Sequence, residues 1–127
     1  MEVGMKHTVK EIVTMEKTAA QVGSGLLPVY ATPAMIALME KCASECVAPY
    51  IEEGKSSVGT MLNVKHLAAS PVGIEITCTA TVTEIDGRRI AFSLEASDAT
   101  GTIGEGTHER FIIDVERFMA KCNAKMN

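Results

Sequence analysis

The 127-residue chain has no tryptophan, two tyrosines and three phenylalanines. It also has no excess of positive charge, since its formal net charge is -4 at pH 7. Proteins that bind nucleic acid need basic residues to meet the phosphates, and many also use aromatic rings to stack on the bases. The composition therefore argues against nucleic acid as a partner.

Long apolar runs are missing as well. No run approaches the roughly 20 residues that a helix needs to span a bilayer. The N-terminal stretch, residues 1–14, carries charges throughout and has no apolar core of a signal peptide. These absences predict a cytoplasmic protein without a membrane partner.

The four cysteines form no CxxC pair. Cys42 and Cys46 lie one helical turn apart, Cys78 falls in a strand pattern, and Cys122 lies near the C-terminus. Most structural metal sites use four ligands, so a CxxxC pair alone does not predict a metal site. We expect buried thiols that pack as small apolar groups.

One long helix is predicted over residues 33–51, where apolar side chains recur at helical spacing. Thr32 is a favoured N-cap residue, and Pro33 suits the first helical position because its missing N–H costs nothing there. Pro49 is expected to tighten or kink the last turn.

Elsewhere the apolar spacing changes to two, the period of a strand. Glycines 23 and 25 and Pro28 interrupt regular structure ahead of the long helix. The expected strands cover residues 6–14, 57–68, 74–85, 88–98 and 103–113, and short helical pieces are expected at 16–22 and 114–126.

The order of these elements predicts an α+β fold. One helix must bury its apolar stripe and one sheet must cover a face, so the economical arrangement wraps a curved sheet of about five antiparallel strands around the helix. That is the hotdog architecture, here as a single domain over residues 1–127. The sheet would leave an edge strand open, and pairing of two such edges predicts a homodimer.

Three segments carry a resemblance to a known family: ATPAMIALMEKCASECVAPYI (31–51), SSVGTMLNVKHLAASPVG (56–73) and DGRRIAFSLEASDATGTIGEGTHERFIID (86–114). An Ala-Thr pair is followed by Leu-Met-Glu and later by a histidine, and a GTHER run follows in the third segment. Together they resemble the fluoroacetyl-CoA thioesterase family of the hotdog superfamily. The resemblance implies hydrolysis of acyl-CoA, with Thr32, Glu40 and His66 as catalytic residues and Gly59 shaping the acyl site.

The chain departs from the family's namesake in two places. Pro33 stands where the namesake has glycine, so one backbone donor is missing at the helix start. The stretch GSGLL, residues 23–27, has no aromatic residue where the namesake carries a phenylalanine-bearing lid. We therefore expect thioester hydrolysis without a strong preference for the fluorinated acyl group.

The residues can also be interpreted without the family. Thr32 would be a structural N-cap that accepts from the N–H of Ala34 or Met35, or a hydroxyl that takes part in acyl transfer at a helix N-terminus. Glu40 has no basic helical neighbour, so its carboxylate is either desolvated and suited to act as a base or simply exposed. His66 shares the apolar face of its strand and is either a core residue or a partner of Glu40.

His108 shares a strand face with Gly104, Gly106 and Arg110, and the glycines suggest close approach of another backbone. A structural role or a dimer contact is the first expectation for His108. The three arginines Arg88, Arg89 and Arg110 are candidates to meet the phosphates of coenzyme A, and Arg110 is taken as a substrate-binding residue.

The leading prediction is a thioesterase acting on a short-chain acyl-CoA, with coenzyme A as part of the substrate and no metal or other cofactor. A non-catalytic module that binds or senses acyl-CoA is the alternative, because fold does not fix function. A hotdog hydratase is ranked last, since the sequence has no Asp-x-x-x-x-Asn-x-His stretch.

Overall fold

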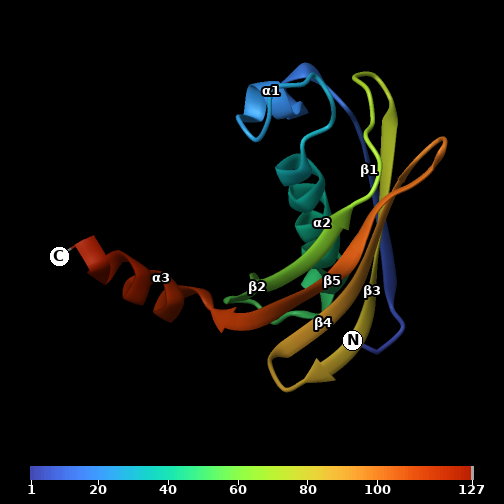
Figure 1. Ribbon diagram of the computed structural model, residues 1–127. Helices are drawn as coiled ribbons and strands as arrows, with labels where there is room; N and C mark the ends of the chain where they lie inside the picture. Colours follow the sequence, from blue (N-terminus) through green and yellow to red (C-terminus); the bar gives the residue numbers. More distant parts are fainter. Residues whose placement is uncertain (127) are drawn as a thin grey trace.

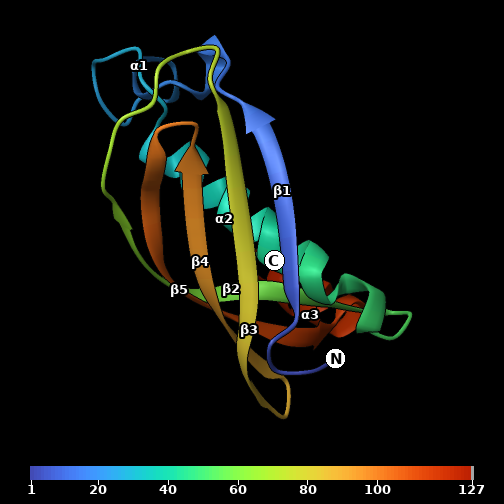
Figure 2. The same ribbon diagram turned by 90° about the vertical axis from the view of Figure 1, so that its right-hand side faces the viewer.

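The structure is a computed structural model that describes residues 1–126, so Asn127, the end of the predicted domain, lies outside the described residues. A five-stranded antiparallel sheet curves around one long helix, α2 (Thr32–Val47), as Figures 1 and 2 show from two sides. This arrangement is the predicted α+β hotdog architecture.

The sheet has the strand order β1-β3-β4-β5-β2, so β1 and β2 form its two edges. Its strands lie close to the predicted positions, although β2 and β5 each begin two residues earlier than expected and β1 and β2 each end two residues earlier. Their bounds are β1 (Lys6–Ile12), β2 (Lys55–His66), β3 (Glu75–Asp86), β4 (Arg89–Asp98) and β5 (Gly101–Asp114).

Short helical elements lie at both ends of α2 and at the end of the chain. One turn, α1, lies over the N-terminal end of α2, whereas α3 projects away from the sheet (Figure 1). No helix within residues 1–126 is long and apolar enough to cross a membrane. The bounds are η1 (Met15–Lys17), α1 (Ala19–Val22), η2 (Ala48–Tyr50), α3 (Val115–Asn123) and η3 (Ala124–Met126).

The core lies between α2 and the concave face of the sheet. Cys42, Cys46 and Cys78 are buried in it as free thiols, as expected, whereas Cys122 on α3 is exposed, so the prediction of a buried thiol is wrong there. The Cys42 thiol donates to the carbonyl oxygens of His7 and Cys78, at 3.2 and 3.4 Å.

Period-two burial in β3 and β4 matches the predicted alternation. The buried side chains face α2, while the threonines and charged residues between them lie on the outer face. The inward set consists of Ile76, Cys78, Ala80, Val82, Ile90, Phe92, Leu94 and Ala96.

The start of α2 differs from the prediction. Ala31, not Thr32, is the N-cap, and no side chain caps the helix. Backbone bonds fix the chain's entry instead, because Ala31 N–H donates to Lys17 O at 2.9 Å and Met35 N–H donates to Ala31 O at 3.0 Å. The Thr32 hydroxyl is therefore free for another partner. At the other end α2 tightens into η2 at Pro49, as expected.

Candidate active site

Thr32 and His66 form the central pair of the candidate site. Thr32 is the first residue of α2 and His66 the last of β2, and Thr32 Oγ1 lies 2.8 Å from His66 Nδ1. The pair lines a pocket of about 300 Å³ that α1, Tyr30 and residues 67–69 also border. The structure therefore brings together two of the three predicted catalytic residues.

Gly104 allows this meeting of helix and edge strand. His66 pairs with Gly104 of β5, and a Cβ atom on Gly104 would lie 2.5 Å from the Met35 Sδ atom. Met35 belongs to the first turn of α2, so a side chain at position 104 would require the end of the Met35 side chain to move. A Cβ atom on Gly106 would likewise lie 2.2 Å from the Asn63 carbonyl oxygen, so these glycines mark the expected close approach.

His66 is suited to act as a base. Burial lowers the pKa of its imidazole, so the ring is neutral at pH 7. Its Nε2 atom is buried and has no hydrogen-bond partner among residues 1–126. When the Thr32 hydroxyl donates to Nδ1, the proton of the neutral ring is on Nε2, which leaves a buried donor without an acceptor. Such orphaned groups are rare and need an explanation.

Glu40 lies elsewhere within the chain. It follows Thr32 by eight residues, which is about 12 Å of helical rise. Its Oε2 atom lies 3.6 Å from Arg110 Nη1, and its side chain is 40% exposed. A Glu40–His66 pair, one of the two interpretations of His66, is therefore not formed within one chain. Of the two interpretations of Glu40, the exposed carboxylate describes the single chain better than the desolvated one.

Arg110 is a buried residue that supports this carboxylate. Its Nε atom donates to Ser57 Oγ at 2.8 Å and its Nη2 atom donates to Ser57 O at 2.9 Å. Its Nη1 atom donates to His108 Nε2 at 3.2 Å. The arginine is only 7% exposed, so within a single chain it holds Glu40 and does not face solvent. Its role in substrate binding stays a prediction.

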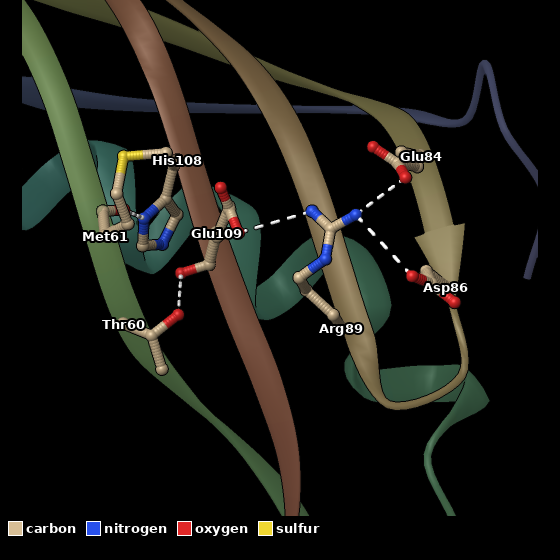
Figure 3. A network of polar contacts seen from close by, with 7 residues as sticks. All are labelled: Thr60, Met61, Glu84, Asp86, Arg89, His108 and Glu109. Atoms are coloured by element: carbon tan, nitrogen blue, oxygen red, sulfur yellow. Dashed lines mark hydrogen bonds and ion pairs between the residues drawn. The ribbon is translucent and has the colours of Figure 1, made fainter.

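His108 completes this buried network. Its Nδ1–H group donates to the Met61 carbonyl oxygen at 2.8 Å (Figure 3), and its ring stacks on Phe92 with centroids 5.9 Å apart. Burial lowers the pKa of His108, and the Arg110 charge acts in the same direction. The residue is neutral and fully buried, which agrees with the structural role expected for it.

Gly59 leaves room for the Glu40 carboxylate. A Cβ atom at this position would lie 2.7 Å from Glu40 Oε2 and 3.2 Å from His108 Cε1. Ser57, two residues earlier on β2, was not recognised in the sequence, because nothing local distinguishes it from other strand serines. The carboxylate, the glycine and the arginine thus form one assembled unit, which lies apart from the Thr32–His66 pair.

The wall of the pocket is held by a second polar group. The Tyr30 hydroxyl donates to Glu11 Oε2 at 2.5 Å, and Lys17 Nζ lies 2.6 Å from Glu11 Oε1. Burial and the neighbouring Glu11 charge raise the pKa of Tyr30, so its hydroxyl keeps its proton. The tyrosine is 1% exposed and fixed in place. Within residues 1–126, no three His, Cys, Asp or Glu side chains are grouped to hold a metal.

Comparison with known proteins places this geometry in a family. Residues 13–116 match the family described as fluoroacetyl-CoA-specific thioesterase. The chain belongs to that family. It is 43% identical over 97 residues to the fluoroacetyl-CoA thioesterase of Streptantibioticus cattleyicolor, covering 76% of this chain and 70% of that protein.

Solved structures agree with the assignment. A fluoroacetyl-CoA thioesterase superposes with a TM-score of 0.95 at 37% identity, covering 98% of this chain and 97% of that one. A hot-dog-like protein from Thermanaerovibrio acidaminovorans superposes with a TM-score of 0.91 at 26% identity, covering 100% and 94%. These matches confirm the hotdog fold and the predicted activity: this family member is an acyl-CoA thioesterase.

Proposed function

We propose that this thioesterase works as a homodimer paired through β2, in which Glu40 and Gly59 of one subunit complete the Thr32–His66 site of the other. The observation that carries the proposal is the division of the site within one chain. One half has a hydroxyl, an imidazole and an unpaired buried nitrogen. The other half has a carboxylate supported by a buried arginine.

The β2 edge is suited to this pairing. Within the described part of the chain, residues 1–126, the strand has only β5 as a neighbour, so its outer hydrogen-bonding edge is open. Leu62 and Leu67 are 37% and 53% exposed along the same segment, which offers apolar surface to a second copy. The opposite edge, β1, is shorter and carries Lys6, Lys10 and Glu11, and charged residues discourage edge pairing.

Symmetry then fixes the register. In a two-fold dimer, antiparallel self-pairing places residue i opposite residue j of the partner and residue j opposite residue i. If Gly59 faces His66 of the partner subunit, the bulge at Thr60 places the axis at Asn63, which then faces its own copy. Both sites are completed at once, because each Glu40 lies beside its own Gly59.

The chemistry follows from the proton positions. The Thr32 hydroxyl, or a water held on it, attacks the thioester carbonyl carbon while His66 Nδ1 takes the proton. The Glu40 carboxylate accepts the Nε2–H hydrogen bond and stabilises the imidazolium that forms, which is the logic of nucleophile, base and orienting carboxylate. The positive end of the α2 dipole faces the developing oxyanion. The C–S bond then breaks, and the proton on His66 passes to the departing thiolate. When water attacks, this step releases the free acid. When Thr32 attacks, a water that gives its proton to His66 then cleaves the acyl–Thr32 ester, and the proton returns to the Thr32 oxygen as the free acid leaves.

The substrate class is a short-chain acyl-CoA. The pocket of about 300 Å³ suits a small acyl group. The stretch 23–27 offers only Leu26 and Leu27 as bulky groups, and both are exposed, at 93% and 64%. Tyr30 is held by Glu11 and does not serve as a mobile gate. We place the reaction in the cytoplasm, where acyl-CoA is made and used.

Specificity for fluoroacetyl-CoA is not expected to be strong. Replacing one hydrogen by fluorine changes the volume of the acyl group little, and a methylene-sized difference in a pocket is worth about 1–3 kcal/mol. We expect the ratio of kcat/KM for fluoroacetyl-CoA over acetyl-CoA to stay within that range. A preference above about a thousandfold, measured under matched conditions, would show that another residue supplies the discrimination.

The decisive experiment is a thiol-release assay with acyl-CoA substrates of increasing chain length, run beside light scattering at micromolar concentration. We expect turnover that is highest for short acyl groups and a mass of twice the 13.6 kDa chain. Binding without thiol release would favour a non-catalytic acyl-CoA-binding module. A mass of 13.6 kDa alone would exclude the shared site.

A further inference from the structure

A hollow at the far end of the sheet gathers three cations that the proposed chemistry does not use. Arg88 comes from the turn between β3 and β4, and Arg117 and Lys121 come from successive turns of α3. Together with Phe118 they line a space of about 530 Å³. We refer to these four residues as the cation hollow.

The charges of the cation hollow are not neutralised by the described chain. Among residues 1–126, no ion pair involves Arg88, Arg117 or Lys121. Arg89, the neighbour of Arg88 in sequence, lies within 4 Å of three carboxylates (Figure 3). In a chain of net charge -4, three unpaired cations around one space favour an anionic ligand.

Within residues 1–126, Asp114 is the only acidic residue that lines the hollow, and it is already engaged. The Asp114 carboxylate accepts a hydrogen bond from Arg117 N–H at 3.2 Å and so caps α3. The Phe118 ring is 41% exposed, and within residues 1–126 no residue of α3 is buried. A half-exposed ring beside cations suits an aromatic base that carries phosphates, because bases stack on such rings.

The cation hollow lies far from the Thr32–His66 pocket of its own chain, but pairing of β2 would place it near the pocket of the partner subunit. A hydrogen bond of 3.0 Å from Val115 N–H to Gly54 O ties the start of α3 to the start of β2. His66 is at the other end of β2, roughly 35 Å away along the strand. Antiparallel self-pairing of β2 brings the start of one strand to the end of the other, so the hollow of one subunit lies beside the Thr32–His66 pocket of its partner.

We propose that the cation hollow binds the phosphate groups and adenine of the acyl-CoA whose acyl group occupies the partner subunit's pocket. The inference rests on the proposed dimer and substrate. Arg88, Arg117 and Lys121 meet the phosphates, and Phe118 meets the base. The flexible arm between nucleotide and thioester spans the two subunits. Substrate binding then requires both subunits, because the nucleotide lies on one subunit and the acyl group in the pocket of the other.

The test compares two thioesters that differ only in the nucleotide. Acetyl-CoA carries the phosphates, whereas acetyl-pantetheine has the same thioester without them. The double variant R117E/K121E should raise KM for acetyl-CoA about tenfold or more, because charge-assisted contacts to phosphate become repulsive. Its kcat for acetyl-CoA and its kcat/KM for acetyl-pantetheine should stay unchanged. Lys6→Glu is the matched control, because Lys6 is an exposed cation without an ion pair on β1, the opposite edge.

Four outcomes would overturn the inference. Equal losses with both thioesters would mean that α3 acts on the fold or the dimer, which light scattering of the double variant checks. No change with either thioester, or an equal KM increase in Lys6→Glu, would mean that the hollow does not bind phosphate specifically. If the wild-type protein hydrolyses neither thioester, the proposed function fails. Calorimetric titration with adenosine 3′,5′-bisphosphate still tests the hollow in that case. If the double variant binds this compound as tightly as the wild type does, the hollow is not its binding site.

Discussion

The two halves of the candidate site differ in how completely their polar atoms are satisfied. Around Glu40, every polar group of Arg110 and His108 that the structure buries has a partner, and Gly59 leaves the carboxylate its space. At the other end of α2, the His66 ring has one hydrogen bond and one buried nitrogen without any. The buried polar groups of the first region are all hydrogen-bonded, whereas the second region lacks one hydrogen-bond acceptor.

This difference indicates a division of labour. The hydrogen-bonded Arg110 keeps a positive charge 3.6 Å from the Glu40 carboxylate, and a fixed charge of this kind supports an orienting or basic group. A hydroxyl–imidazole pair in an open pocket can contact substrate directly. We therefore assign the reaction to the Thr32–His66 end and its support to the Glu40–Arg110 end. A separate substitution tests each assignment.

The largest effect is expected at the reacting end. His66→Ala removes the base that takes the Thr32 proton, and loss of a positioned base costs about 10²–10⁴-fold in rate. Steady-state hydrolysis of acetyl-CoA measures the loss, and circular dichroism checks that the variant folds. A folded variant with full activity would show that His66 is only a core residue.

The supporting end should respond in stability first. Arg110→Met keeps much of the side chain's bulk but removes the donors to Ser57 and His108 and the charge beside Glu40. Leaving buried polar groups without partners costs about 1–3 kcal/mol. Urea unfolding measures this change. We expect the urea midpoint of His66→Ala to lie closer to that of the wild type than the midpoint of Arg110→Met does. If His66→Ala is the less stable of the two variants, the assignment of support to the Glu40–Arg110 end is contradicted.

The smallest effect concerns the pH dependence of stability. Burial lowers the pKa of His108 in the folded chain below its ordinary value of 6.5. Between the lowered pKa and pH 6.5 the unfolded chain binds more protons, so the free energy of unfolding falls as the pH drops through this window and levels off below it. His108→Gln should flatten that slope relative to wild type, with His66 present in both proteins. Parallel slopes in urea titrations from pH 7.5 to 5 would show that His108 titrates normally.

Much of the fold could be predicted from local patterns. The period of two in β3 and β4 and the apolar stripe of α2 are read directly from neighbouring residues, and both are found. Thr32 as N-cap was wrong, because the backbone bonds of Ala31 that start the helix involve Lys17, which no helix-capping pattern includes. Local propensity did not reveal that the hydroxyl faces a histidine 34 residues away.

The division of the site could not be predicted from one chain's sequence. No basic residue stands three or four positions from Glu40 on its own helix, which suggested desolvation, but Arg110 reaches it from β5, 70 positions later. Family resemblance named the three catalytic candidates without saying which subunit supplies each. Gly59 and Gly104 carried a usable signal, since glycine inside a strand marks a close approach.

Subunit complementation tests the central claim most directly. Glu40→Gln and His66→Ala are each expected to be inactive alone. When the two are mixed, unfolded and refolded together, a shared site predicts that each mixed dimer regains one intact site, built from the wild-type His66 of one chain and the wild-type Glu40 of the other. Random pairing should then restore about a quarter of wild-type activity. If the catalytic residues act within one chain, every mixed dimer stays inactive, and a mixture no more active than its components would contradict the account.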